Sequence, residues 1–274
     1  MIMGMLLGLL CAISGQNWML IWLGLETNLM SFLMLISQNL TSKKKLSLYF
    51  VVQSFGSLLI LAGGVLQNSV SSSLITIGLA VKLGLIPVHF WIMPVISSLL
   101  SYELSMFLTM QKIGPLTLLF SVNNSKLLFT LLVMNAVMGG IMVLSCTLFQ
   151  HMVMFSGMVH VSWLLGSVGN SMFWEYMGVY MLILTVMVYC WSNNYFMSMS
   201  WNLLNLGGLP PFWGFWVKLK PLMILNMISI PVLLSASMMT LYAYIRLLLS
   251  SLAISKIYTK EDFNMLTFII LFPH

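Results

Sequence analysis

Five charged side chains lie inside long apolar segments of the sequence, where a charge is costly. Glu26 lies in "WLGLETNLM", Lys82 in "AVKLGLIPVHFW" and Lys112 in "TMQKIGPL". Lys218 and Lys220 follow a turn-forming stretch in "GGLPPFWGFWVKLKPL". A charge at the centre of a membrane helix costs about 2.5–3.5 kcal/mol on insertion scales, so such residues face protein or water and usually carry function. Because burial disfavours the charged form of lysine, these side chains suit a proton relay.

Two histidines are further candidates for the same chemistry. His89 and His160 lie deep within their apolar segments, and imidazole is the side chain that most readily exchanges protons near neutral pH. The alternative is that both are hydrogen-bonded core residues, and the sequence leaves the two interpretations open.

The composition defines the elements that must position these residues. Of the 274 residues, 60% are hydrophobic and only 6% are charged, against about 25% charged in a soluble domain. The sequence therefore predicts an all-α, polytopic membrane protein. The three cysteines, Cys11, Cys146 and Cys190, are far apart and have no spacing typical of a metal, cluster or haem site. No cofactor is expected on this chain, and nucleic acid is excluded as a partner because the basic residues are split between loops and buried positions.

Polar breaks divide the chain into about ten membrane spans and a shorter eleventh segment. Loops after even-numbered spans carry five lysines, whereas loops after odd-numbered spans carry only Lys126. The positive-inside rule then places the N-terminus on the same side as the lysine-rich loops. The predicted spans are 2–15, 17–38, 46–67, 73–97, 104–121, 126–149, 151–168, 172–191, 199–229, 231–252 and 263–272.

A short repeat suggests how the spans are organised. "GLIPVHFW" begins at Gly84 in the fourth span, and "GLPPFWGFW" begins at Gly208 in the ninth. Five helices per block would make the second copy cross in the opposite direction, as in inverted-repeat transporters whose interrupted helices mark the ion path. The expectation is two inverted halves, about 1–124 and 125–252, followed by a loop and short segment at 253–274. A chance match is the alternative. The prolines predict an interruption near Pro87 and another near 207–211.

Blocks of sequence around these charges resemble the NADH:ubiquinone oxidoreductase chain 2 family of mitochondrial respiratory complex I. They occur in family order over nearly the whole chain, which makes the resemblance specific. The family is derived from antiporter-like subunits similar to cation/proton antiporters. The blocks are "GLETN" at 24–28, "VKLGLIPVHFW" at 81–91, "QKIGP" at 111–115, "FSGMVHVSW" at 155–163, "LGGLPPFWGF" at 206–215 and "LYAYIRL" at 241–247.

The resemblance implies roles for the charged residues. Glu26 and Lys82 would form the charged pair of one half-channel, Lys112 the central relay, and Lys218 the lysine of the second broken helix. The family usually has proline immediately before that last lysine, whereas this chain has Val217. This departure leaves the assignment open between Lys218 and Lys220.

The resemblance also implies a place for the chain. It would be a proton-translocating subunit in the mitochondrial inner membrane, with its N-terminus on the matrix side and other membrane-arm subunits as partners. NADH, FMN, iron–sulfur clusters and ubiquinone would be bound by partner subunits, with no redox chemistry on this chain. Two alternatives remain: a stand-alone or multisubunit cation/proton antiporter, and a structural membrane subunit without its own pump.

Overall fold

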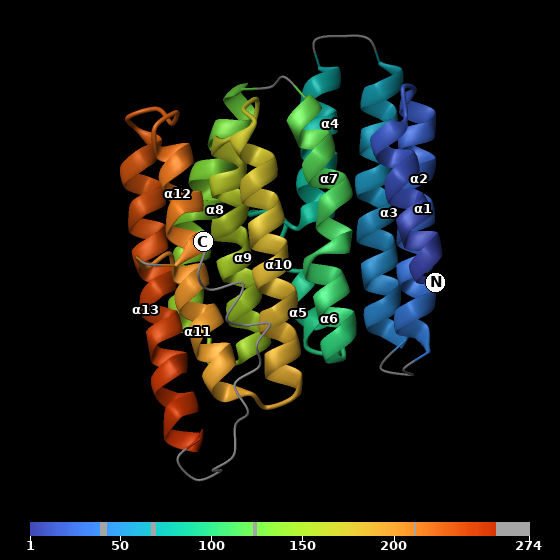
Figure 1. Cartoon of the computed structure of the whole chain (residues 1–274). Helices are drawn as coiled ribbons and strands as arrows, with labels where there is room; N and C mark the ends of the chain where they lie inside the picture. Colours follow the sequence, from blue (N-terminus) through green and yellow to red (C-terminus); the bar gives the residue numbers. More distant parts are fainter. Residues whose placement is uncertain (39–42, 67–69, 123–124, 211, 256–274) are drawn as a thin grey trace. The chain divides into compact units, whose positions relative to one another are not determined.

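The computed structural model describes residues 1–38, 43–66, 70–122, 125–210 and 212–255. These residues form thirteen helices and no strand, in agreement with the predicted all-helical architecture (Figure 1). The chain divides into two compact units, Met1–Leu131 and Leu132–His274, with the boundary inside one helix.

The first unit is built from seven helices and the beginning of an eighth. Helix α3 packs closely on α4: a Cβ atom added to Gly78 of α4 would lie 2.7 Å from the carbonyl oxygen of Gly56 on α3. Such close backbone approach at small residues is how membrane helices gain packing energy. The seven helices are α1 (Ile2–Ser14), α2 (Trp18–Ser37), α3 (Lys43–Val65), α4 (Ser71–Leu83), α5 (Ile92–Ile96), α6 (Ser101–Leu108) and α7 (Met110–Ser121).

The second unit surrounds a central helix, α9, whose residues are nearly all buried. A helix that is apolar on every side is expected at the centre of a bundle, and α9 contacts α10, α12 and α13. The helices are α8 (Ser125–Ser145), α9 (Phe149–Gly166), α10 (Met172–Ser192), α11 (Phe196–Gly207), α12 (Trp213–Leu222) and α13 (Ser229–Ser255).

Five helices in the described part of the chain are long and apolar enough to cross a membrane. The predicted spans 73–97 and 199–229 are not among them, because each is divided into two shorter helices. The five are Trp18–Ser37, Lys43–Val65, Lys126–Ser145, Met172–Ser192 and Ser229–Leu249.

The interruption predicted near Pro87 is confirmed. Helix α4 stops where Gly84 adopts a left-handed backbone conformation, with a φ of 65° that favours glycine. The amide of Leu85 then donates to the carbonyl of Ala80 at 2.9 Å, which closes the helix end. The chain is not α-helical again until α5 begins at Ile92.

The second predicted interruption is also confirmed and begins with a similar turn. Helix α11 ends at Gly207, and Gly208 has a φ of 79° in the left-handed region. The amide of Gly208 donates to the carbonyls of Leu204 and Asn205. Helix α12 then begins at Trp213. The inverted relation between the two halves remains a prediction.

One predicted span is wrong as a single helix. The segment placed at 104–121 begins earlier, at Ser101, and is divided at Thr109, whose φ is −112° and ψ is −77°. Pro115 lies within α7, and a proline ring clashes with the carbonyl four residues before it, which favours a kink in this region. The segment predicted at 263–272 lies outside the described residues.

Candidate functional site

Glu26 is tied to two neighbouring helices of the first unit. It lies half-buried on α2, and the Ser57 hydroxyl of α3 donates a hydrogen bond to its Oε1. The Glu26 carboxylate also interacts electrostatically with the ammonium of Lys82 on α4. The structure therefore brings together the acid and the lysine that the sequence predicted to act as a pair.

Lys82 is buried at the end of the interrupted helix α4. The side chain is 7% exposed and passes so close to α3 that a Cβ atom added to Gly56 would lie 3.1 Å from its Cγ. Its backbone carbonyl accepts a hydrogen bond from Nε2 of Gln53 at 3.0 Å. Because the last carbonyls of a helix have no partner within it, this bond stabilises the interruption.

Lys112 reaches the same cavity as Lys82. Lys112 lies on α7 and is 7% exposed, and its neighbour Gln111 donates to Oδ1 of Asn28 at 3.0 Å. A small cavity of about 10 Å³ is lined by both lysines, together with Tyr49, Gln53, Leu83, Phe107 and Gln111. That volume is near the minimum of about 10–15 Å³ that accommodates one water molecule, and the lining is polar enough to bind it. Two titratable amines thus face one water-sized space.

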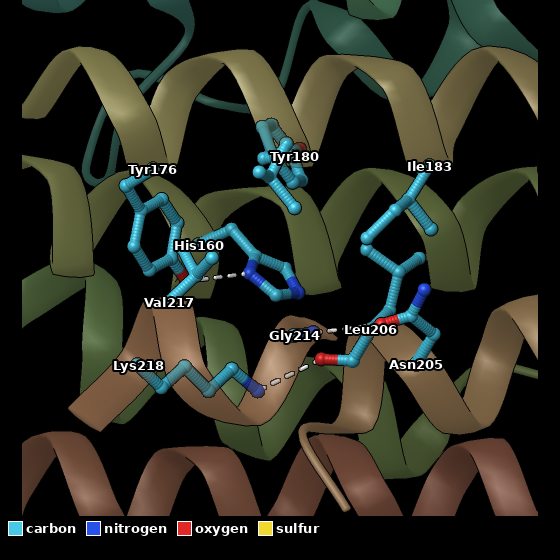
Figure 2. A pocket seen from close by; sticks show the side chains of 10 residues that line it. His160, Tyr176, Tyr180, Ile183, Asn205, Leu206, Gly214, Val217 and Lys218 are labelled. Atoms are coloured by element: carbon cyan, nitrogen blue, oxygen red, sulfur yellow. Dashed lines mark hydrogen bonds between the residues drawn. The ribbon is translucent and has the colours of Figure 1, made fainter. Parts of the chain in front are cut away.

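The side chain of Lys218, on α12, reaches the second interruption. It is 9% exposed, and its Nζ donates to the carbonyl oxygen of Leu206 at 2.8 Å (Figure 2). It also donates to the carbonyl oxygen of Gly207 at 2.9 Å. These carbonyls end α11 and would otherwise lack partners. The ammonium of a residue on α12 therefore stabilises the end of α11.

Asn205 joins the two halves of this interrupted helix. Its Oδ1 accepts a hydrogen bond from the amide of Gly214 at 2.8 Å (Figure 2). A Cβ atom added to Gly214 would lie only 1.9 Å from the backbone oxygen of Asn205. Only glycine fits between these segments. Lys218 lies one helical turn further along α12, so this contact positions it.

His160 shares a cavity with Lys218. Its Nδ1 lies 2.9 Å from the hydroxyl oxygen of Tyr176, and its ring stacks on Tyr180 with centroids 4.8 Å apart (Figure 2). His160, Lys218 and both tyrosines line a cavity of about 20 Å³. This volume is large enough to hold one water molecule.

His89 is placed differently. It is buried in the segment between α4 and α5, where its ring is tilted by 32° against that of Phe90 with centroids 4.2 Å apart. It is not among the residues that line the cavity of Lys82 and Lys112. The structure therefore brings His160 onto the cavity of Lys218, whereas His89 does not line the cavity of Lys82 and Lys112.

Lys220 lies apart from the site. Its ammonium forms an ion pair with Glu175 of α10, and the two side chains are 47% and 52% exposed. Val217, where the family has proline, is buried beside Lys218 and lines its cavity. Of the two candidate lysines, Lys218 is therefore the one with the buried geometry expected of a relay residue.

Several residues of these sites were not predicted from the sequence: Ser57, Gln53, Gln111, Asn28, Tyr176 and Asn205. Uncharged polar residues are common in membrane helices, so none was conspicuous individually. A signal did exist on α3, where Gln53 and Ser57 recur at a four-residue spacing in an apolar helix.

The fold is similar to that of solved antiporter-like proteins. A chain of "Respiratory complex I from Thermus thermophilus with bound Aureothin" matches with a TM-score of 0.83 at 18% identity, covering 96% of this chain and 70% of that one. A chain of the Mrp complex from a Dietzia species matches with a TM-score of 0.73 at 16% identity, covering 94% of this chain and 59% of that one. At such identities the likeness concerns the fold alone.

Sequence comparison identifies the family. Residues 64–193 match the family model described as "NADH:quinone oxidoreductase/Mrp antiporter, TM". The NADH-ubiquinone oxidoreductase chain 2 of Anopheles gambiae is 32% identical over 282 residues, covering 89% of this chain and 82% of that protein. That of Myxine glutinosa is 30% identical over 289 residues, covering 90% and 83%. The fold and the sequence blocks at the two interruptions are consistent with these relatives. The chain therefore belongs to the NADH-ubiquinone oxidoreductase chain 2 family.

Proposed function

We propose that this chain is an antiporter-like membrane subunit of proton-pumping respiratory complex I. Protons pass through it while electrons move from NADH to ubiquinone in partner subunits. The observation that carries the proposal is the cavity shared by Lys82 and Lys112, together with the electrostatic interaction between Glu26 and Lys82. A buried lysine pair beside an acid can exchange a proton, whereas a merely structural helix bundle needs no such arrangement.

In this proposal, the charge of Glu26 controls a proton relay between Lys82 and Lys112 in the first unit. The Glu26 carboxylate attracts the Lys82 ammonium electrostatically. Neutralising or displacing Glu26 therefore removes a substantial stabilisation of the Lys82 ammonium. Lys82 then releases its proton, which a water molecule in the shared cavity passes to Lys112.

In the second unit the proposed relay lysine is Lys218. In its protonated form this lysine is stabilised by the carbonyls of Leu206 and Gly207. His160 lines the same cavity and can accept or donate a proton near neutral pH. We propose Glu26, Lys82 and Lys112 as the proton-relay residues of the first unit, and Lys218 and His160 as those of the second.

The surroundings follow from the same proposal. The chain lies in the mitochondrial inner membrane with its N-terminus on the matrix side, next to other antiporter-like subunits of the membrane arm. NADH, FMN, iron–sulfur clusters and ubiquinone are bound by partner subunits, and this chain carries no redox step.

Substituting Lys82 by methionine tests the proposal. The Lys82→Met change keeps an apolar chain of similar length and removes the titratable amine. In sealed vesicles containing the assembled complex, we expect fewer protons translocated per NADH oxidised. Lys126→Met is the matched control, because Lys126 is exposed on α8. Normal pumping by an assembled Lys82→Met complex would favour a purely structural subunit.

A cation/proton antiporter is the second candidate function, and the likeness of the fold to an Mrp complex chain favours it. The same lysines would then exchange protons for a metal cation without electron transfer. Purification separates the two possibilities: the complex I subunit copurifies with NADH-oxidising subunits, whereas an antiporter shows cation-dependent proton transport without them.

A further inference from the structure

A polar stripe runs along α3 from its first turn to the partner of Glu26. Lys45, Tyr49, Gln53 and Ser57 follow one another at four-residue intervals. Residues four apart lie on the same face of a helix, about 6 Å apart along its axis. Gln53 and Ser57 already belong to the relay site, so the question is what Lys45 and Tyr49 do.

A second cavity lies at the Lys45 end of this stripe. It has a volume of about 10 Å³ and is lined by residues that include Lys45, Leu46, Tyr49 and Ser98. Lys45 is half-buried there, and its Nζ donates to the hydroxyl of Ser97 at 3.2 Å. This outer cavity therefore begins next to the lysine-bearing end of α3 and accommodates about one water molecule.

Tyr49 lines both the outer cavity and the inner cavity of Lys82 and Lys112. It is only 1% exposed. Three aromatic rings enclose it: Phe32 and Trp91 have centroids 5.7 Å from its own, and Phe107 lies at 6.2 Å. Tyr49 is thus a buried residue common to two water-sized spaces, with apolar rings around it.

The phenol hydroxyl has the chemistry that such a position needs. A hydroxyl can accept a hydrogen bond on one side while it donates on the other. It can therefore take a proton from water in one cavity and release its own proton to water in the next. The phenyl rings of Phe32 and Phe107 have no group that can do this, and the indole N–H of Trp91 can donate a hydrogen bond but cannot accept one.

We propose that Tyr49 is the proton bridge between the Lys45 end of α3 and the Lys82–Lys112 cavity. Tyr49 lines both cavities, and none of the three rings around it has a group that can both accept and donate a hydrogen bond. The inference rests on the proposed function, because it assigns a route to the protons that Lys82 and Lys112 exchange.

Removing the hydroxyl alone is the test. Tyr49→Phe keeps the ring and its aromatic contacts, and Tyr102→Phe is the matched control on an exposed tyrosine of the same unit. Proton translocation per NADH oxidised is measured for the assembled complex in sealed vesicles, alongside Lys82→Met. We expect Tyr49→Phe to lose the same share of translocated protons as Lys82→Met, and Tyr102→Phe to match the unsubstituted complex.

The rate in H₂O relative to that in D₂O distinguishes a bridge from a packing residue. If Tyr49 carries protons, the ratio rises in Tyr49→Phe, because proton transfer across the gap becomes rate-limiting. A slower Tyr49→Phe complex with an unchanged ratio would overturn the proposal, as would full pumping by that variant while Lys82→Met is impaired. If Lys82→Met itself pumps normally, the proposed function fails.

A second variant keeps the test decisive if Tyr49→Phe does not assemble. Leu46 is half-buried at the outer cavity, and Leu46→Phe fills that space while leaving the Tyr49 hydroxyl in place. The same loss of translocated protons is expected. Normal pumping by an assembled Leu46→Phe complex would show that protons do not use the outer cavity.

Discussion

Burial and hydrogen bonding divide the lysines of this chain into different classes. Lys218 lies inside the second unit, where its charge is stabilised by two backbone carbonyls, whereas Lys220 lies on the surface in an ion pair. Exposed ion pairs contribute about 0–1 kcal/mol, because water already solvates both groups. A buried ammonium has no such alternative and depends on its protein contacts. Removing Lys218 therefore removes a buried charge and its hydrogen bonds, whereas removing Lys220 removes only an exposed ion pair.

Parallel substitutions of these two lysines test the assignment. Lys218→Met removes the titratable group of the second interruption, so we expect a clear loss of proton translocation. Lys220→Met removes only the exposed pair with Glu175, so we expect stability and pumping close to normal. Both are measured in assembled complex, by melting temperature and by protons translocated per NADH. A larger loss of pumping in Lys220→Met than in Lys218→Met would reverse the assignment.

At the scale of helices, each interruption combines a glycine-based stop with a side chain from elsewhere. In the first unit, Gln53 of α3 binds the carbonyl of Lys82. In the second unit, Lys218 of α12 binds the end of α11. Free carbonyls within a membrane must be satisfied internally. The first lysine is thus left facing a cavity, whereas the second is engaged by the interruption itself.

Gly214 provides the test at this scale. Gly214→Ala would place a Cβ atom 1.9 Å from the backbone oxygen of Asn205, so α12 must move away from α11. Overpacking of this kind costs about 1–3 kcal/mol or more. We expect a lower melting temperature and reduced pumping, because Lys218 moves with α12. Gly178→Ala is the control, since no atom lies within 4 Å of the added Cβ. Equal effects of the two changes would contradict the positioning role of Gly214.

The interruptions were predictable from the sequence, but their contacts were not. "GLIPVHFW" and "GGLPP" predict helix ends locally, because glycine permits the left-handed turn and proline lacks an amide hydrogen. The break at Thr109 was missed, because the sequence has no glycine or proline at the break itself. The Asn205–Gly214 contact requires two segments to meet across the break, which no local pattern specifies.

At the scale of the whole molecule, the relay lysines are divided between two compact units. Lys112 belongs to Met1–Leu131 and Lys218 to Leu132–His274. A relay that runs through both units makes their lysines parts of one path. Independent paths would instead allow each unit to pump by itself.

A double substitution distinguishes these arrangements. If Lys112 and Lys218 serve one path, the double variant Lys112→Met/Lys218→Met should pump no worse than the more severe single variant, because residues that act as a unit are non-additive. Pairing Lys112→Met with the exposed Lys126→Met gives the control. Additive losses for Lys112 and Lys218 would indicate separate paths, and both are measured as protons translocated per NADH.

The sequence by itself determined the all-helical membrane class, both interruptions and the apolar segments in which the charged residues lie. These features depend on local composition: the length of apolar runs, the backbone preferences of glycine and proline, and the cost of a charge in hydrocarbon. The tertiary structure alone decided which side chains meet. Lys218 and Lys220 are two residues apart, and at 3.6 residues per turn they point about 200° apart, so the rotation of α12 decides which is buried. The cavity between Lys82 and Lys112 likewise exists only because α3, α4, α6 and α7 come together, since its lining comes from residues far apart in the chain.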